Sequence, residues 1–124
     1  MKGELKHLFQ RLKSMLKEYE AIFQSKHNDE KRYDLWSFKP VEILGRKRKE
    51  VFFAELIIRK DYVGFYYMPI YTDNELKKVF KPELLSLLKG KSCFHVRELD
   101  GELETKIADA LRIGFDLYKE RGWI

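Results

Sequence analysis

Hydrophobic residues recur every three or four positions through the first part of the chain, with charged residues between them. This is the spacing of one face of an α-helix, and it continues as far as Phe23. A membrane-surface helix favours a strongly basic polar face, whereas Glu4, Glu18 and Glu20 stand among the lysines here. We therefore expect the helix to pack on a sheet through one apolar stripe, formed by Leu5, Leu8, Leu12, Met15, Leu16, Tyr19, Ile22 and Phe23.

The middle of the chain changes to a hydrophobic period of two, which is typical of β-strands. Beyond a polar loop at 25–33, this alternation predicts strands at 34–38, 41–44, 51–59, 62–68 and, further on, 92–97. The turns between neighbouring strands, at 45–49 and 60–61, are so short that the strands must be antiparallel. Strand 51–59 should place Phe52, Ala54, Leu56 and Ile58 on one face, and Phe53, Glu55, Ile57 and Arg59 on the other.

Helical signals return in the second half of the chain. A helical turn or two is expected within 73–80, and a short helix over 82–89 should end at Gly90. Asp100 is the expected N-cap of a long C-terminal helix, because glutamates follow it in the first turn. Gly122 is expected to end that helix.

These elements predict an α+β fold in which an antiparallel β-sheet is covered by the N-terminal and C-terminal helices. The 124 residues, of which 44% are hydrophobic and 15% aromatic, suit a single domain over 1–124 with one packed core. The aromatic share also leaves a homodimer patch open, so the expected state is a monomer or a homodimer.

Charge changes this picture only locally. The net charge is +5, from 25 Lys and Arg against 20 Asp and Glu, and most charges are mixed in sign along the chain. The exception is the basic run at 46–49 in a predicted turn, which suits phosphate contacts in a nucleic-acid-binding protein. A solvated turn is the stronger interpretation, although Trp36 and Phe38 nearby are of the kind on which bases stack.

The single cysteine excludes an internal disulfide, and no stretch approaches the roughly 20 apolar residues that span a bilayer. The N-terminus also lacks the apolar core of a signal peptide. We expect a cytoplasmic protein that has no membrane partner.

Several segments together resemble the YdhG-like family, whose domains have no assigned function. The resemblance covers roughly 33–124 and rests on KDYVGFYYMPIYTDNEL at 60–76, PELLSLLKGKSCFHV at 82–96 and YKERGW at 118–123. It implies a small sheet covered by the terminal helices. Some relatives are described as frataxin-like iron chaperones, so the resemblance also implies ferrous iron as a ligand.

An iron site of this kind needs acidic side chains, because oxygen ligands suit a hard cation. The first helix mixes its glutamates with lysines and is a poor candidate. The C-terminal helix is more acidic, so the predicted metal ligands are Glu102 and Glu104.

A second hypothesis is a small-ligand pocket. Tyrosine gives an apolar wall with a polar tip, and a lysine can pair with an anion. The predicted lining residues are Tyr66, Met68, Tyr71, Lys91 and His95. The alternative is that these rings close the core at the end of the sheet.

Other chemistry is weaker. Cys93 and His95 share a strand face, but two ligands do not make a zinc site. Cys93 could also be a nucleophile with His95 as its base, but no acidic residue that would orient His95 is evident in this segment. Gly90, Lys91 and Ser92 resemble the end of a phosphate-binding loop, yet Leu85 occupies the position of its first glycine. We expect a non-catalytic binding protein, with iron, a small ligand and nucleic acid as the open alternatives.

Overall fold

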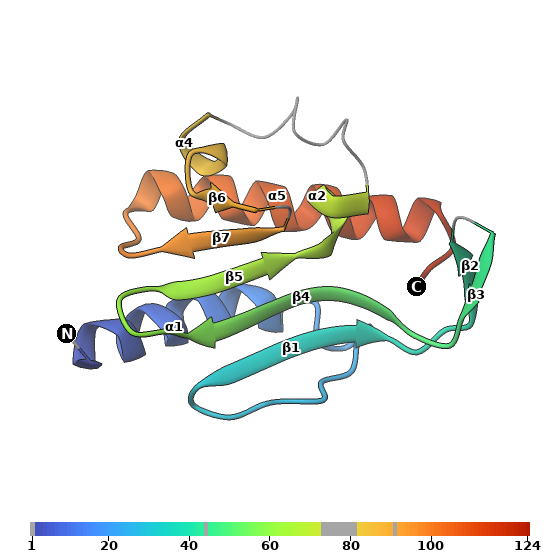
Figure 1. Ribbon diagram of the computed structural model, residues 1–124, viewed down its shortest axis with the longest axis horizontal. Helices are drawn as coiled ribbons and strands as arrows, with labels where there is room; N and C mark the ends of the chain where they lie inside the picture. The colour runs from blue at the N-terminus through green and yellow to red at the C-terminus, as the bar shows by residue number, and fades with distance from the viewer. Residues whose placement is uncertain (1, 44, 73–81, 91) are drawn as a thin grey trace.

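The computed structural model describes residues 2–43, 45–72, 82–90 and 92–124, which form a sheet layer and a helix layer (Figure 1). The α+β prediction is confirmed. The elements in chain order are α1 (Lys2–Lys17), β1 (Arg32–Ser37), β2 (Val41–Ile43), β3 (Arg46–Arg48), β4 (Val51–Ile58), β5 (Val63–Tyr67), α2 (Met68–Thr72), α4 (Pro82–Leu85), β6 (Leu88–Lys89), β7 (Cys93–Val96) and α5 (Gly101–Glu120).

The main sheet has the order β1-β4-β5-β7-β6, and every neighbouring pair is antiparallel. Strands β2 and β3 form a separate hairpin, which projects beyond the N-terminal end of β4 (Figure 1). No described helix is long and apolar enough to cross a lipid bilayer.

Helices α1 and α5 cover one face of the sheet, as expected (Figure 1). The strand residues that face them are buried, among them Val63, Phe65 and Tyr67 in β5. The Tyr67 hydroxyl donates a hydrogen bond to the Ala110 carbonyl of α5 at 2.5 Å. This close approach depends on Gly114, because a Cβ there would lie 1.9 Å from the Tyr67 hydroxyl oxygen.

The ends of α5 match the sequence prediction. The Asp100 carboxylate accepts a hydrogen bond from the Leu103 N–H at 2.7 Å, as an N-cap does. Gly122 has a positive φ of 74°, which favours glycine just past a helix end.

The first helix is shorter than its hydrophobic pattern predicts. It ends at Lys17, and hydrogen-bonded turns follow it. Phe23 is nevertheless buried, because its ring stacks on Phe53 at a centroid distance of 4.5 Å. Ile22, also assigned to the apolar stripe, is 55% exposed. The hydrophobic pattern therefore predicted the burial of Phe23 correctly, but it placed this residue in the helix, which ends before it.

Three other predictions need correction or fall outside the described residues. The basic run predicted as a turn contains strand β3. The predicted helix at 82–89 is only α4, followed by strand β6, although Gly90 does have the positive φ expected of its end. The predicted helical turn at 73–80 lies outside the described residues.

Strand β4 departs from simple alternation because its pairing with β1 shifts between Leu35 and Trp36. At this irregularity Phe53 and Ala54 are both fully buried. The Phe53 ring contacts Tyr67 and Tyr118 on the helix-covered side, and Phe52 instead contacts Trp36. The predicted face assignment of Phe52 and Phe53 is therefore wrong. The reason is that β4 has one extra residue, Phe53, at the shift, and an extra residue of this kind reverses the alternation of the side chains beyond it.

The free edge of β1 is covered by the preceding loop. Gln24 forms a bridge with Trp36, and Asn28 with Tyr33. The loop is tied down by Asp34, which is 1% exposed and accepts backbone N–H bonds from Lys26 and His27. Burial is the largest influence on the Asp34 pKa and raises it, but hydrogen bonds from His27 and Lys26 outweigh burial and leave the pKa below its ordinary value.

Candidate functional site

The sheet face turned away from α1 and α5 is the candidate functional site, and we call it the open face. Strand alternation directs every second side chain to it. Both long helices lie behind the sheet when it is viewed from this side (Figure 1). The open face is formed by Arg32, Asp34, Trp36, Phe52, Glu55, Ile57, Arg59, Tyr62, Tyr66, Cys93, His95 and Arg97.

Aromatic rings and arginines gather at one end of the open face. The Tyr62 and His95 rings are stacked, with centroids 3.9 Å apart and an interplanar angle of 13°. The Arg97 guanidinium carbon lies 5.6 Å from the Tyr62 ring centroid. Arg59 donates a hydrogen bond to the Tyr66 hydroxyl at 2.8 Å. We call these five residues the arginine–tyrosine cluster.

Gly64 provides the space for this arrangement. It pairs with His95 across β5 and β7, so it lies in the middle of the cluster. A Cβ at Gly64 would come within 3.0 Å of the Tyr66 ring, which means that the ring lies along the strand over the glycine. The phenol therefore extends towards Arg59 and leaves an aromatic surface flat on the sheet.

The cluster has an excess of positive charge. Within the described part of the chain, neither Arg59 nor Arg97 forms an ion pair with a carboxylate. The pKa of His95 lies below its ordinary value, first because of desolvation and then because Arg97 and Lys89 repel the protonated ring. A phosphate or carboxylate group would find here two guanidinium groups that no described carboxylate neutralises.

Cys93 lies beside Tyr66 across β5 and β7. Burial raises the pKa of its thiol, and this exceeds the opposing effects of a Tyr66 hydrogen bond and the Arg59 charge. His95 shares its face, as expected, but its ring is stacked on Tyr62. A thiol with a raised pKa is a poor nucleophile at neutral pH, so this arrangement does not favour cysteine chemistry.

A second aromatic group lies at the other end of the open face. The Trp36 and Phe52 rings are 5.2 Å apart, and the Lys26 ammonium lies 3.8 Å from the Trp36 ring centroid. Beyond this end projects the β2–β3 hairpin, which carries three consecutive exposed basic residues at 46–48 (Figure 1). Rings and cations thus occur at both ends of β4.

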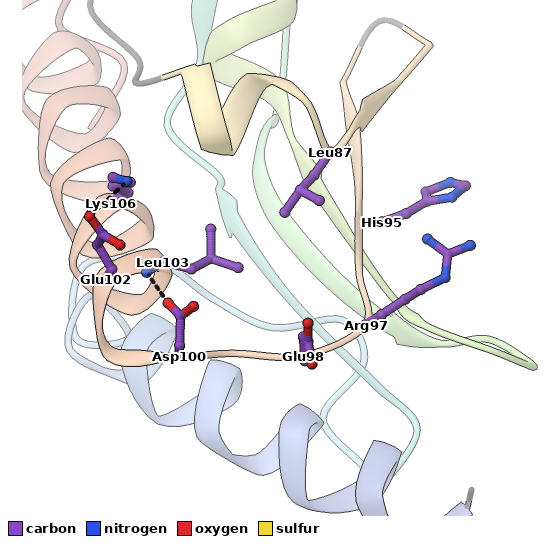
Figure 2. A pocket seen from close by; sticks show the side chains of 8 residues that line it. All are labelled: Leu87, His95, Arg97, Glu98, Asp100, Glu102, Leu103 and Lys106. Atoms are coloured by element: carbon purple, nitrogen blue, oxygen red, sulfur yellow. Dashed lines mark hydrogen bonds and ion pairs between the residues drawn. The ribbon is translucent and has the colours of Figure 1, made fainter.

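A pocket of about 330 Å³ lies between β7 and the start of α5 (Figure 2). The Leu87 and Leu103 side chains point towards each other across it, whereas His95 and Arg97 point away from α5. The other lining residues are charged and of both signs, namely Glu98, Asp100, Glu102 and Lys106. This volume is at the lower limit for small-molecule sites, which are mostly apolar.

The predicted metal ligands do not share one site. Glu102 pairs with Lys106 at 3.7 Å, whereas Glu104 pairs with Arg11 at 2.5 Å. The two glutamates also line different pockets. Iron binding at Glu102 and Glu104 stays a prediction, and each carboxylate already has a cationic neighbour.

The predicted pocket residues are only partly brought together. Tyr66 and His95 lie on the open face in adjacent strands, and Met68 begins α2. The side chain of Tyr71 and the whole of Lys91 lie outside the described residues.

The residues predicted for the pocket did not include Arg59, Tyr62 or Arg97. Their positions on alternating strands were visible in the sequence. What the sequence did not show was the pairing of β5 with β7, two strands separated by a long connection, and this pairing puts Tyr62 on His95.

Comparison with known proteins gave no relative from which a role for these residues could be transferred. No protein-family model, no curated protein and no solved structure matches this chain.

Proposed function

We propose that the open face binds single-stranded nucleic acid and that the protein is a binding protein rather than an enzyme. The observation that carries the proposal is the arginine–tyrosine cluster, where two arginines adjoin flat aromatic rings and have no carboxylate partner among the described residues. Single strands are bound by this combination, because exposed bases stack on aromatic rings and the backbone phosphates pair with cations.

The shape of the face favours an extended ligand. A small molecule binds best where a concave site buries most of its surface. The open face is a sheet surface with rings and cations at both ends of β4. The eight residues of β4 span about 26 Å at roughly 3.3 Å per residue, which is room for about four nucleotides or more.

The acidic residues on the open face present little free charge. Glu55 is paired with Arg32 at 2.6 Å, and Asp34 is buried beneath its hydrogen bonds to His27. A strand crossing from one aromatic group to the other therefore meets one carboxylate that is paired with an arginine and one that is buried. The basic β2–β3 hairpin extends the positive path, and phosphate contacts there are the weaker of the two interpretations of its sequence.

The other predictions have less support. The resemblance to the YdhG-like family rests on the sequence segments quoted above, and the ligand it implies is ferrous iron. Ferrous iron at Glu102 and Glu104 would have to displace Lys106 and Arg11. A small ligand bound by Tyr66 and His95 would use the same rings as the proposed nucleic acid.

Fluorescence anisotropy with labelled oligo-dT and oligo-rU of twelve nucleotides tests the proposal. We expect Tyr66→Leu to weaken binding about tenfold, because stacking contributes roughly 1–3 kcal/mol per base. Arg97→Gln should weaken binding to every sequence and reduce the salt dependence by about one phosphate contact.

Arg112→Gln is the matched control, since Arg112 is an exposed arginine of α5. Equal losses for Arg97→Gln and Arg112→Gln would mean unspecific attraction to a basic protein and would contradict the proposal. Absence of binding at low salt would refute it outright.

A further inference from the structure

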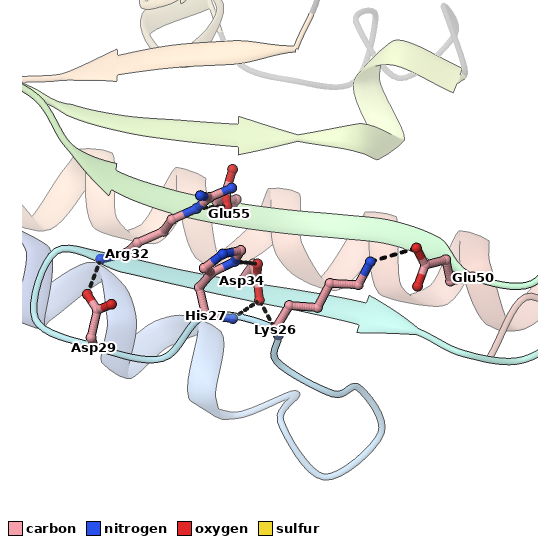
Figure 3. A network of polar contacts seen from close by, with 7 residues as sticks. All are labelled: Lys26, His27, Asp29, Arg32, Asp34, Glu50 and Glu55. Atoms are coloured by element: carbon pink, nitrogen blue, oxygen red, sulfur yellow. Dashed lines mark hydrogen bonds and ion pairs between the residues drawn. The ribbon is translucent and has the colours of Figure 1, made fainter.

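A histidine and two carboxylates converge on the open face at β1 and β4 (Figure 3). The His27 Nδ1 atom lies 2.7 Å from Asp34 Oδ2, and Glu55 is the residue opposite Asp34 in the antiparallel pair. One ligand atom from each of the three residues lies within 4.8 Å of the other two. We call these residues the His27 cluster.

The position of Asp34 in the cluster is fixed by its second oxygen. Asp34 Oδ1 accepts hydrogen bonds from the backbone N–H groups of Lys26 and His27 at 2.7 and 3.0 Å. The Asp34 side chain is 1% exposed, so it has little freedom to turn. Metal sites depend on such hydrogen bonds, because they hold each ligand in its orientation before the ion binds.

The cluster also has an accessible side. The Glu55 side chain is 12% exposed and the His27 side chain 42% exposed, while Asp34 forms the buried base. An ion can therefore enter from solvent and keep water molecules as its remaining ligands.

We propose that His27, Asp34 and Glu55 bind one divalent transition-metal ion of the zinc class. An imidazole nitrogen with two carboxylate oxygens suits such ions, whereas magnesium and calcium prefer oxygen alone. Tetrahedral coordination with bonds of about 2.1 Å places ligand atoms about 3.4 Å apart, so the widest separation in the cluster must shrink by up to roughly 1.4 Å. The His27 Nδ1 and Asp34 Oδ2 atoms, now 2.7 Å apart, must separate slightly, because the ion replaces the proton that they share and that proton leaves to solvent. The flexible Glu55 side chain can supply that movement.

Arg32 opposes this binding. Its Nε atom donates to Glu55 at 2.6 Å, so the ion and the guanidinium compete for one carboxylate. The Arg32 side chain is 43% exposed and can turn into solvent when the ion binds. Removing the Arg32 charge should therefore tighten metal binding, whereas a cluster that only tethers the loop gives no such gain.

Isothermal titration calorimetry with Zn²⁺ alone, without any oligonucleotide, tests the site. We expect one ion per chain, at least tenfold weaker binding in Glu55→Gln and His27→Gln, and tighter binding in Arg32→Gln. Asp29→Asn is the matched control, because Asp29 is an exposed carboxylate of the same loop that lies outside the cluster. The affinity of this variant for Zn²⁺ should equal that of the unmodified protein.

NMR of the histidine rings identifies the ligand directly. Zn²⁺ should shift the His27 ring signals and leave those of His7 and His95 in place. No bound zinc, zinc bound through His7 or His95, or equal affinity in Glu55→Gln and Asp29→Asn would each overturn the proposal. Circular dichroism of Glu55→Gln and Arg32→Gln checks that both variants are folded. Because no oligonucleotide is present, either result is independent of the nucleic-acid proposal.

Discussion

The two faces of strand β5 differ although their side chains alternate along one short segment. Phe65 is 1% exposed and packs against the Tyr67 and Phe94 rings beneath the helices. Its neighbour Tyr66 lies on the open face, with its ring over Gly64 and its hydroxyl on Arg59. The helix-covered face is what a small core requires. Flat rings beside arginines that have no carboxylate partner among the described residues contribute little to folding and need another explanation.

The largest expected effect comes from separating these two faces by substitution. Phe65→Ala should lower the free energy of unfolding by about 3–5 kcal/mol, because it leaves a cavity in the core. Tyr66→Ala should lower it by about 1 kcal/mol or less, because the ring is only half-buried. Urea unfolding followed by circular dichroism measures both. Similar losses would show that the open face is part of the stabilising core.

The next effect tests how closely α5 approaches the covered face. Gly114→Ala should destabilise the protein by about 3 kcal/mol, since the new Cβ meets Tyr67 and Pro69 side-chain atoms at 1.9 and 2.8 Å. Gly101→Ala, also in α5, is the control because no atom lies within 4 Å of its Cβ position. Equal midpoints for the two variants would contradict the tight packing of Tyr67 on this helix.

The smallest effect is electrostatic and concerns the open face. In the free protein the pKa of His95 lies below its ordinary value, so the neutral form of the ring predominates at pH 7. A bound phosphate near Arg97 would offset the repulsion of the protonated ring, so the pKa should rise and binding should take up protons as the pH falls. NMR titration of the His95 ring with and without oligo-dT measures the change. In the free protein, Arg97→Gln should raise the pKa of His95, because it removes one of the repelling charges. A lower pKa in the presence of oligo-dT would contradict binding at the cluster.

The covered face could be predicted from the sequence because its signals are local. Leu8, Leu12 and Leu16 were expected on the apolar stripe of the first helix and are buried, and Asp100 and Gly122 act at the ends of α5 as expected. Each of these predictions depends only on residues within a few positions. The resulting α+β layer follows from packing the apolar stripes against one another.

The open face was harder to predict because its residues come from distant segments. The His27 cluster combines a loop residue with two strands, and no local pattern indicates that Glu55 lies opposite Asp34. The pairing shift at Leu35 exchanges the faces of Phe52 and Phe53, which simple alternation cannot anticipate. Ends of elements were also missed where tertiary contacts decide them, as at Phe23.

The way the sheet ends has a consequence for association with other chains. At one edge, the loop that carries Gln24 and Asn28 already pairs with β1, and at the other edge β6 contains only two residues. Within the described residues, a strand from another molecule therefore meets no long row of free backbone groups, which limits edge-to-edge aggregation. Recognition by this domain should therefore depend on side-chain chemistry rather than on backbone pairing. A single substitution can abolish recognition of the first kind, whereas backbone pairing is available to almost any sequence.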